Sequence, residues 1–383
     1  MHERRGMTHI GQRVVVEREH LPNLMTALRA EGHRLIGPTV RDGAIVHAEI
    51  QGVEDLPAGW TSEQEAGTYR LRRRDDGALF GYAAGPQSWK QSFFAPAARL
   101  WHGRFEGGNS LVLEEDRAPP RLALVGARAC DLSALAIHDR IFLGERHVDP
   151  DYAARRRGTF VVAVQCGTPG GTCFCASMGT GPRARYGFDL ALTELLEGRH
   201  RFVVEAGSEA GAALLGRVRH APADEGEARD ADAVVEAAAG RMGRALRAEG
   251  VRDALLRNLE HPRWEEVAGR CLACANCTLV CPTCFCATVE DTTDLAGVEA
   301  ERVRCWDSCF TLDHSHLHGG PVRTSIKSRY RQWLTHKVAW WIDQFGMSGC
   351  VGCGRCITWC PVGIDLTEEV AAIRAGTEPK EVH

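Results

Sequence analysis

The N-terminal part of the chain alternates between amphipathic segments and short apolar runs. Residues 21–31 place apolar side chains at helical spacing, which predicts a helix. Residues 121–125 and 159–166 are short and apolar, which predicts two buried strands. Between these two strands, Asp131 is placed to cap a helix over residues 132–142. This succession of helices and buried strands predicts an α/β N-terminal domain.

Two Asp-Gly pairs predict β-hairpins. Asp42-Gly43 lies between the strand-like segments 34–39 and 44–50. Asp76-Gly77 lies inside residues 68–82, TYRLRRRDDGALFGY. Asp-Gly favours the tight turns that join antiparallel strands. We therefore expect one hairpin centred on each pair.

Two later segments have helical patterns. Residues 208–262 are rich in alanine and predict helices that break at Gly216, Gly240 and Gly250. Residues 328–345, SRYRQWLTHKVAWWIDQF, have an amphipathic pattern and predict another helix. The fold class that follows is an α/β N-terminal domain joined to a C-terminal α-helical dicluster domain of ferredoxin-like type.

The cysteines divide the chain unevenly. Only four of the sixteen fall before residue 270, and twelve follow it. This shift in composition predicts two domains. The first, residues 1–262, is the α/β domain with its alanine-rich helical extension. The second, residues 263–383, is the dicluster domain with a long insertion at 287–349.

Charge and hydropathy exclude several classes of protein. The net charge is −4 and the isoelectric point about 6.5, which argues against a nucleic-acid-binding protein. No run of apolar residues is long enough for a membrane span, and the N-terminal stretch lacks the apolar segment of a secretory signal. We expect a cytoplasmic protein, whose cysteines serve metal sites or redox chemistry rather than disulfides.

The chemistry concentrates in a spacing that occurs twice, C-x2-C-x2-C-x3-C followed by proline. The two runs are Cys271, Cys274, Cys277 and Cys281, then Cys350, Cys353, Cys356 and Cys360. This is the bacterial ferredoxin spacing for [4Fe–4S] clusters. Zinc is the alternative, but zinc sites typically use two separated C-x2-C pairs. The double match favours two [4Fe–4S] clusters.

In two-cluster ferredoxins the fourth cysteine of each run ligates the other cluster. We therefore assign the metal ligands in crossed sets. Cluster 1 takes Cys271, Cys274, Cys277 and Cys360. Cluster 2 takes Cys350, Cys353, Cys356 and Cys281.

The remaining cysteines include an internal repeat, because Thr-Cys-Phe-Cys occurs at 172–175 and again at 283–286. Three interpretations are open: buried small hydrophobes, a redox-active pair, or ligands of a third [4Fe–4S] cluster where the two repeats meet. The candidate ligands are Cys166, Cys173, Cys175, Cys284, Cys286 and Cys309. Cys130, near the start of a predicted helix, suits a ligand or reactive thiol, and a buried structural cysteine equally well.

Several segments together point to a family. They are GPQSWKQSFFAP, GARACDLSALAIHDRIFL, CGTPGGTCFCASMGTGP, RCLACANCTLVCPTCFCATVEDTTDL, RVRCWDSCF and CVGCGRCITWCPVGIDL. The chain resembles the β subunit of cytoplasmic sulfhydrogenase-type [NiFe] hydrogenases, and the related A subunit of anaerobic sulfite reductase. The resemblance covers about residues 81–364. Cys305 departs from the family pattern, which has a basic residue there, so it is the weakest candidate for a shared role.

The resemblance implies a non-catalytic electron-transfer subunit of an oxidoreductase complex. Its partners would be a flavin-containing NAD(P)H-reductase subunit and a hydrogenase subunit, or a sirohaem subunit in a sulfite or polysulfide reductase. The residues agree, since no G-x-G-x-x-G fingerprint follows a predicted strand and no paired motif for nickel is present. A structural adaptor whose clusters carry no electrons is a further alternative. The sequence does not separate the hydrogenase from the reductase, or NAD from NADP.

Overall fold

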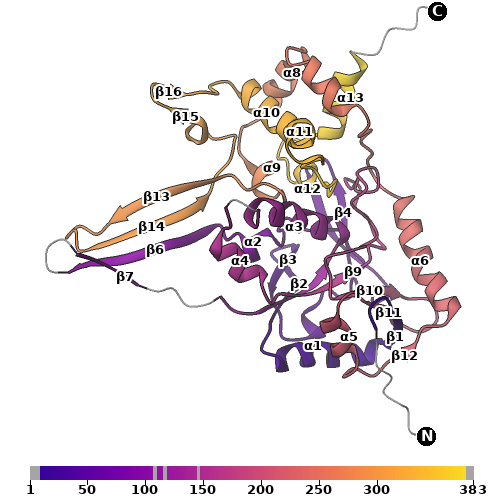
Figure 1. Cartoon of the computed structure of the whole chain (residues 1–383). Helices are drawn as coiled ribbons and strands as arrows, with labels where there is room; N and C mark the ends of the chain where they lie inside the picture. Colours follow the sequence, from indigo (N-terminus) through magenta and orange to yellow (C-terminus); the bar gives the residue numbers. More distant parts are fainter. Residues whose placement is uncertain (1–8, 107–109, 115–118, 145–146, 377–383) are drawn as a thin grey trace, which may run out of the picture.

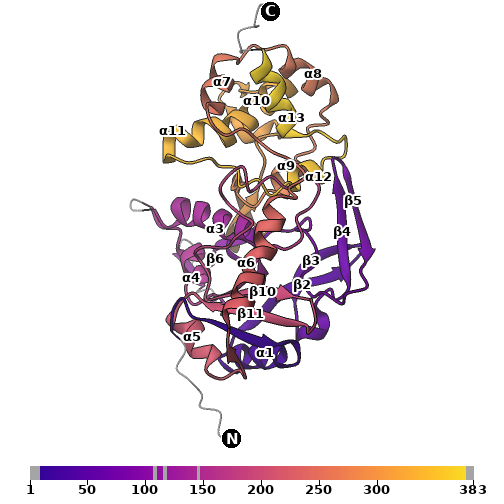
Figure 2. The same cartoon turned by 90° about the vertical axis from the view of Figure 1, so that its right-hand side faces the viewer.

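The computed structural model describes residues 9–106, 110–114, 119–144 and 147–376. The first eight residues, part of the N-terminal stretch considered above, lie outside this range. A sheet with helices on its faces forms one end of the molecule, and a helical region forms the other (Figures 1 and 2). In the part of the chain that the structure describes, no helix is long and apolar enough to cross a membrane.

The main sheet has eight strands in the order β12-β1-β11-β10-β9-β8-β2-β3. Its strands are β1 (Arg13–Glu17), β2 (Arg34–Arg41), β3 (Ala44–Glu49), β8 (Leu122–Ala127), β9 (Phe160–Val164), β10 (Leu190–Leu195), β11 (Arg201–Ala206) and β12 (Ala221–Pro222). The four strands β2, β8, β9 and β10 run parallel, and the outer strands pair antiparallel. β8 and β9 are buried at every position, as expected for central parallel strands.

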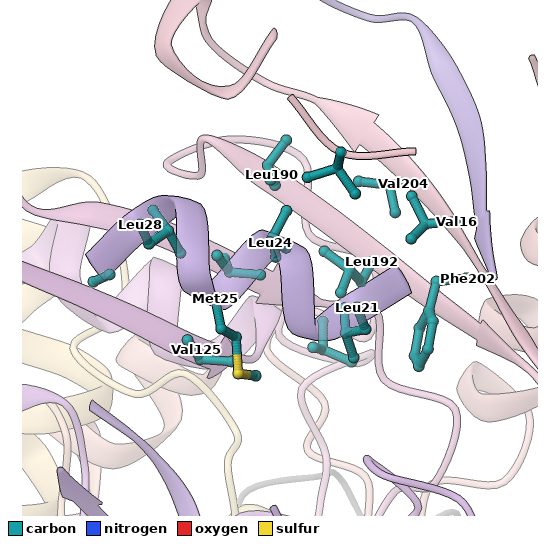
Figure 3. Close-up of a cluster of buried hydrophobic side chains, with 14 of the residues drawn as sticks. Val16, Leu21, Leu24, Met25, Leu28, Val125, Leu190, Leu192, Phe202 and Val204 are labelled. Atoms are coloured by element: carbon teal, nitrogen blue, oxygen red, sulfur yellow. The ribbon is translucent and has the colours of Figure 1, made fainter. Parts of the chain in front are cut away.

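Helices cover the sheet and seal its core. They are α1 (Leu21–Ala30), α2 (Lys90–Phe93), α3 (Ala129–Phe142), α4 (Pro150–Arg156), α5 (Glu209–Leu215) and α6 (Glu225–Ala239). The apolar face of α1, with Leu21, Leu24 and Met25, packs into the same buried cluster as Val125 of β8 and Leu192 of β10 (Figure 3). Each such buried side chain contributes about 1.5–3 kcal/mol.

The C-terminal region is a compact group of short helices. They are α7 (Val251–Arg257), α8 (Arg263–Arg270), α9 (Asn276–Leu279), α10 (Ile326–Thr335), the π-helix η4 (His336–Trp340), α11 (Trp341–Phe345), α12 (Arg355–Thr358) and α13 (Leu366–Ala375). Trp264, Tyr330 and Trp333 pack at its centre together with apolar residues of α13. The cysteine runs lie between this core and the main sheet.

A second sheet projects from the body as a long arm, which is clearest in Figure 1. Its strands are β6 (Ala97–Glu106), β7 (Ser110–Glu114), β13 (Ala287–Thr293) and β14 (Glu299–Trp306), in the order β13-β14-β6-β7. β14 pairs antiparallel with β6, so that Arg302 lies opposite Trp101. The first half of the predicted insertion therefore forms one sheet with a segment of the predicted N-terminal domain.

The smaller elements complete the chain. They are η1 (Arg18–His20), η2 (Val53–Asp55), β4 (Trp60–Glu65), β5 (Thr68–Arg73), η3 (Asp313–Ser315), β15 (His316–Leu317) and β16 (Gly320–Pro321). β4 pairs with β5, and β15 with β16, as two separate hairpins.

Most of the predicted elements are confirmed. The helix at 21–31, the hairpin around Asp42-Gly43 and the two buried strands are present as α1, β2–β3, β8 and β9. The alanine-rich segment forms α5, α6 and α7, and the glycine breaks fall between them. Residues 328–345 form a continuous helical stretch through α10, η4 and α11.

Two details of the prediction are wrong. The second hairpin turns at Ala66-Gly67, where Gly67 has φ of +71°, and not at Asp76-Gly77. Asp76 instead pairs with Arg74 and accepts a hydrogen bond from the backbone N–H of Ala78. Helix α3 also begins earlier than predicted, with Arg128 as its cap. Asp131 sits one turn inside and accepts from the Arg128 backbone N–H at 3.0 Å.

Candidate metal centres

The two cysteine runs adopt the same backbone conformation. In the first run Ala273 and Ala275 have φ of +50° and +65°. At the equivalent positions of the second run, Gly352 and Gly354 have φ of +64° and +74°. Alanine rarely adopts this left-handed conformation, and its presence here marks a backbone held in place by its surroundings. The two runs therefore share the same turn between their first three cysteines.

Cys271, Cys274 and Cys277 of the first run line a cavity of about 460 Å³, its open mouth included. Cys360, the last cysteine of the second run, lines the same cavity, and Cys356 reaches its wall. The other walls are apolar and include Phe310, Tyr330 and Trp333. Five cysteines therefore line this apolar cavity, and a [4Fe–4S] cluster takes four thiolates.

The thiols of the second run have Cys281 as their neighbour. Burial raises the pKa of Cys356 well above its ordinary value, and the nearby Cys350, Cys281 and Cys353 raise it further. Burial likewise raises the pKa of Cys350 to about 12. Thiols in such surroundings ionise readily only next to a strong positive charge, which a metal centre supplies.

Lys337 lies against this second group of thiols. Its Nζ donates to Cys281 Sγ at 3.2 Å, to Thr283 Oγ1 at 3.0 Å and to Cys284 Sγ at 3.4 Å. The side chain is buried and extends from the π-helix η4, a form of helix often found at functional sites. Burial lowers the pKa of Lys337, but the Cys281 and Cys284 sulphurs outweigh it and raise the pKa well above its ordinary value.

A second buried cation, Arg355, joins the second run to the sheet. Its Nη2 donates to Asp131 Oδ1 at 2.9 Å, and its Nε donates to the Gly85 carbonyl at 3.1 Å. Both charged side chains are almost fully buried, with exposed fractions of 1% and 4%. The ion pair therefore fixes α12 of the helical region against α3 of the sheet region.

Sequence reasoning missed both cations. Lys337 stands in the apolar stretch HKVAWW, and an isolated charge on an apolar helix face was the available signal. Arg355 carries no such signal, because its acidic partner is more than two hundred residues away in the chain.

Apart from Cys305 in β14, the cysteines outside the runs separate into three places. Cys130, Cys166, Cys173 and Cys175 line one cavity of about 380 Å³, whose wall also includes Cys353. Cys284 lies beside Cys281 and Lys337. Cys286 and Cys309 form a pair with His314. The structure thus brings together three of the six predicted third-site cysteines, and it does not place the two Thr-Cys-Phe-Cys repeats around one cavity.

The two repeats instead both contact the loop that begins the second run, at Gly352 and at Gly349. From the first repeat, the Phe174 backbone N–H donates to the Gly352 carbonyl at 2.8 Å. From the second repeat, Thr283 Oγ1 donates to the Gly349 carbonyl at 2.7 Å. The two similar repeats therefore pack against the same partner, the start of the second cysteine run.

The pair Cys286 and Cys309 is polarised by its neighbours. A hydrogen bond from Cys309 lowers the pKa of Cys286 to about 4, with His314 adding to the effect. The hydrogen bond between His314 and Cys286 raises the pKa of His314 to about 9. Asp307 also accepts from His314 Nδ1 at 2.7 Å. The neighbouring His316 and His318 are exposed, and Cys305 is half-buried in β14 opposite Ala97.

The thiols are spread too widely for a single ion. Among the residues that the structure describes, no three histidine, cysteine or acidic side chains converge closely enough to hold one metal ion. A tetrahedral zinc site requires four ligand atoms at about 2.3 Å from one centre. Thiols placed around the walls of a cavity are an arrangement that a cubane, with four iron corners, can take.

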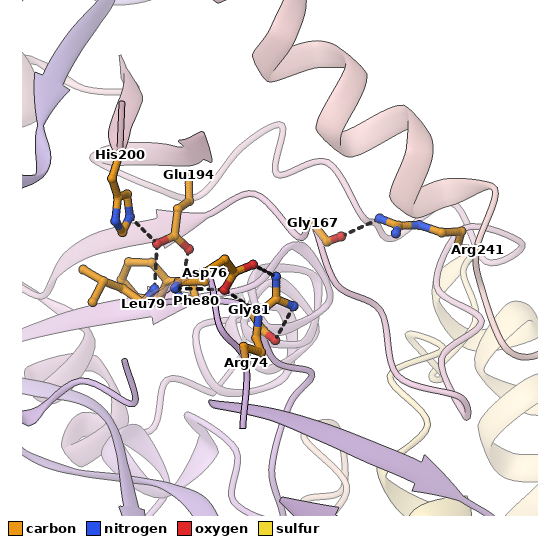
Figure 4. Close-up of polar contacts among 10 residues, drawn as sticks. Arg74, Asp76, Leu79, Phe80, Gly81, Gly167, Glu194, His200 and Arg241 are labelled. Carbon is orange, nitrogen blue, oxygen red and sulfur yellow. Dashed lines mark hydrogen bonds and ion pairs between the residues drawn. The ribbon is translucent and has the colours of Figure 1, made fainter. Parts of the chain in front are cut away.

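A wide cavity with both charged and apolar residues in its walls lies elsewhere, beside β9 and β10, and measures about 1280 Å³ with its open mouth included. Glu194 there accepts from the backbone N–H groups of Leu79 and Phe80, and from His200 Nε2 (Figure 4). Arg241 donates to the Gly167 carbonyl at 2.9 Å. These charged groups serve the protein's own backbone, so the cysteine cavities remain the sites with distinctive chemistry.

Comparison with known proteins agrees with this chemistry. Residues 270–364 match the family described as 4Fe-4S dicluster domain. Sulfhydrogenase 2 subunit beta of Pyrococcus furiosus is 34% identical over 262 residues, which is 67% of this chain and 75% of that protein. No solved structure matches the chain.

Proposed function

This chain belongs to the family of the sulfhydrogenase beta subunit, and we propose that it carries electrons inside a multisubunit, NAD(P)-linked [NiFe] hydrogenase. It is an iron–sulfur electron-transfer subunit with a dicluster domain. The observation that carries the proposal is the pair of equivalent cysteine loops, each with a fourth thiol beside it that comes from the other run.

The proposed ligand sets are crossed. Cluster 1 is held by Cys271, Cys274, Cys277 and Cys360, and cluster 2 by Cys350, Cys353, Cys356 and Cys281. Support for the first set comes from the shared cavity, and for the second from the mutual electrostatic effects of its thiols. The crossing is the arrangement of two-cluster ferredoxins, which also supports a ferredoxin-like helical region.

The two sites differ in their access to a partner. Cys274 and Leu272 are exposed at the first cavity, while Cys350 and Cys353 of the second run are buried. Electrons reach an external donor or acceptor most easily through a centre close to the surface. We therefore assign cluster 1 to the contact with a flavin-containing NAD(P)H-reductase subunit, and the buried cluster 2 to the interior of the path.

The proposed organisation is an α/β domain over 1–262 and a dicluster domain over 263–383, with α7 of the first range packed in the helical core of the second. The β6–β14 pairing and the Asp131–Arg355 ion pair join these two ranges into one body. The expected location remains the cytoplasm, where reduced thiols are available for cluster assembly.

Purification from the native host without oxygen tests the function. We expect the chain to co-purify with a nickel-containing subunit and a flavin subunit, and NAD(P)H to reduce its clusters within the complex. A sirohaem partner would assign it instead to a sulfite or polysulfide reductase. Clusters that neither NAD(P)H nor any redox mediator reduces would leave only a structural adaptor.

A further inference from the structure

We propose that the cavity between the carboxyl edge of the main sheet and the second cysteine run holds a third [4Fe–4S] cluster. Its ligands are Cys130, Cys166, Cys173 and Cys175. Three of these four cysteines, Cys166, Cys173 and Cys175, were predicted from the sequence as ligands of a third cluster. The set omits the other predicted ligands, Cys284, Cys286 and Cys309, and adds Cys130. The site stands on its own geometry and does not depend on the partner proposed above.

The topology of the sheet puts the first two ligands together. Cys130 lies in the first turn of α3, directly after strand β8, and Cys166 follows the end of strand β9. These strands are parallel neighbours, so their carboxyl ends meet at one edge. In open α/β sheets this edge is where ligands bind.

The other two ligands lie on a tightly held loop. The Cys173 carbonyl accepts from the Arg244 backbone N–H at 3.0 Å, and the Arg244 side chain bonds to the Gly171 carbonyl at 2.8 Å. On the opposite side, a Cβ at Gly352 would lie 2.7 Å from the Cys175 backbone nitrogen. The backbone of the Cys173–Cys175 loop is therefore held by the backbones of Arg244 and Gly352, which restricts the directions of the two thiols.

The cavity has a suitable size and lining. At about 380 Å³ it is comparable with the cavity of about 460 Å³ at the first run. Besides the five cysteines, its walls are mostly small or apolar residues, namely Ala83, Ala84, Ala129, Pro169, Pro182 and Met242. The thiols do not converge on a single-ion position within the described residues, so the space between them suits a group larger than one ion.

Positive partial and full charges face the same space. Arg128 lines the cavity and is almost fully buried, and its guanidinium donates to the carbonyls of Gln165, Phe80 and Tyr82. The fourteen-residue helix α3 presents its N-terminus there, where the helix dipole favours an anion. The Gly170 backbone N–H also donates to Cys173 Sγ at 3.3 Å. A cubane with four thiolates is anionic, and these groups compensate its charge.

The position of Cys353 connects this site to the ferredoxin clusters. Cys353, a proposed ligand of cluster 2, forms part of the same cavity wall. With both clusters in place, one electron would pass directly between them, and the cluster that loses it would be oxidised as the other is reduced. The third site extends the electron path from the helical region into the sheet region.

The test uses the full-length chain with its clusters, purified anaerobically. Wild-type protein should carry about twelve iron atoms per chain, on the basis of four per cubane. Cys166→Ser and the double variant Cys173→Ser, Cys175→Ser should each carry about eight, while the spectroscopic signals of clusters 1 and 2 persist. Cys305→Ser, at a half-buried position in β14, is the matched control and should keep the wild-type iron content.

Three outcomes would overturn the proposal. The first is about eight iron atoms in the wild type, since that leaves none for a third cubane. The second is full iron retention in both variants. The third is loss of the extra cluster through Cys284→Ser or Cys309→Ser instead. Because clusters 1 and 2 are followed separately by electron paramagnetic resonance, failure of the third site is distinguishable from failure of the electron-transfer function.

Discussion

At the scale of single residues, two positions of the same loop show how packing decides what a side chain can be. The first run tolerates Ala275 in the left-handed region, whereas the second run has Gly354 in its place. A Cβ at Gly354 would lie 2.4 Å from the Thr172 carbonyl oxygen. The glycines of the second run are therefore required by the first Thr-Cys-Phe-Cys repeat packed against them.

The first prediction compares two glycines with the same backbone conformation. The thermal unfolding midpoint of the Gly352→Ala variant should be well below that of the Gly250→Ala variant. Both substitutions put alanine at positive φ, which costs about 1–2 kcal/mol. Only Gly352 also meets backbone atoms at 2.7 Å, and such overpacking adds about 1–3 kcal/mol. Equal midpoints for the two variants, measured by circular dichroism, would show that the contact is unimportant.

The second prediction concerns Lys337 and the potential of cluster 2. Hydrogen bonds to cluster sulphurs are one determinant of reduction potential, and a nearby cation stabilises the reduced, more negative state. A hydrogen bond between charged groups contributes about 1.5–3 kcal/mol. Since 59 mV corresponds to a tenfold change for one electron, Lys337→Met should lower the potential by roughly 60–130 mV.

The measurement is a redox titration followed by electron paramagnetic resonance. Lys327→Met is the control, because Lys327 pairs with the exposed Glu260 and Glu265. The potential of cluster 2 should be unchanged in that variant. A shift of the same size in both variants would mean that the contact with Cys281 has no special role.

The two cysteine runs could be recognised as candidate cluster ligands from the sequence, because the ferredoxin spacing is a local pattern. The environments of Lys337 and Arg355 could not. Their roles depend on burial and on partners that are distant in sequence, and local patterns do not contain this information.

At the scale of elements, the contact between α3 and α12 depends on one buried ion pair. Asp131→Asn keeps the side-chain shape and an oxygen that can accept from the Arg128 backbone, but it leaves the Arg355 charge without its partner. Removing one member of a buried pair costs about 3–5 kcal/mol. We expect a correspondingly large fall in the thermal unfolding midpoint.

The matched control is Asp343→Asn, which breaks a partly exposed pair with Arg252. Pairs of this kind contribute about 0–1 kcal/mol, so its midpoint should stay close to the wild type. If the two variants unfold at the same temperature, the buried pair does not hold the elements together.

Most elements followed from local signals, and the failures have physical causes. Asp76-Gly77 has the composition of a hairpin turn, but the Asp76 side chain accepts a hydrogen bond from Arg74. Strands β4 and β5 pair instead around the earlier turn at Gly67. Strands within a hairpin pair with a neighbour in sequence, so local patterns can predict them. Which of two nearby turns is used depends on how the strands pack against the rest of the molecule, and local patterns do not contain this.

At the scale of the whole molecule, the two predicted domains are built as one unit. Strands β6 and β14 come from residues about two hundred positions apart, and no local pattern could have paired them. The second cysteine run is likewise covered by residues of the sheet region, through Phe174 and Asp131. The cavity that we assign to a third cluster exists only where the two regions meet.

A fourth prediction follows from this joint construction. Residues 263–383 expressed alone should fail to retain the eight or so iron atoms of two cubanes, because the second run loses its packing partners and Arg355 its counter-ion. Iron and sulfide analysis after anaerobic purification, beside the full-length chain, measures this. A fragment with its full complement of both would establish that the dicluster region is independent.

The second cysteine run has a further consequence for electron transfer. Its loop is contacted at Gly349 by Thr283, at Val351 by Thr180 and at Gly352 by Phe174. Ligands on such a loop have little freedom to shift when the charge of the centre changes. A preorganised environment of this kind keeps the reorganisation energy small. In the proposed cluster 2, distance and driving force would then set the rate of electron transfer, and motion of the protein would contribute little to the barrier.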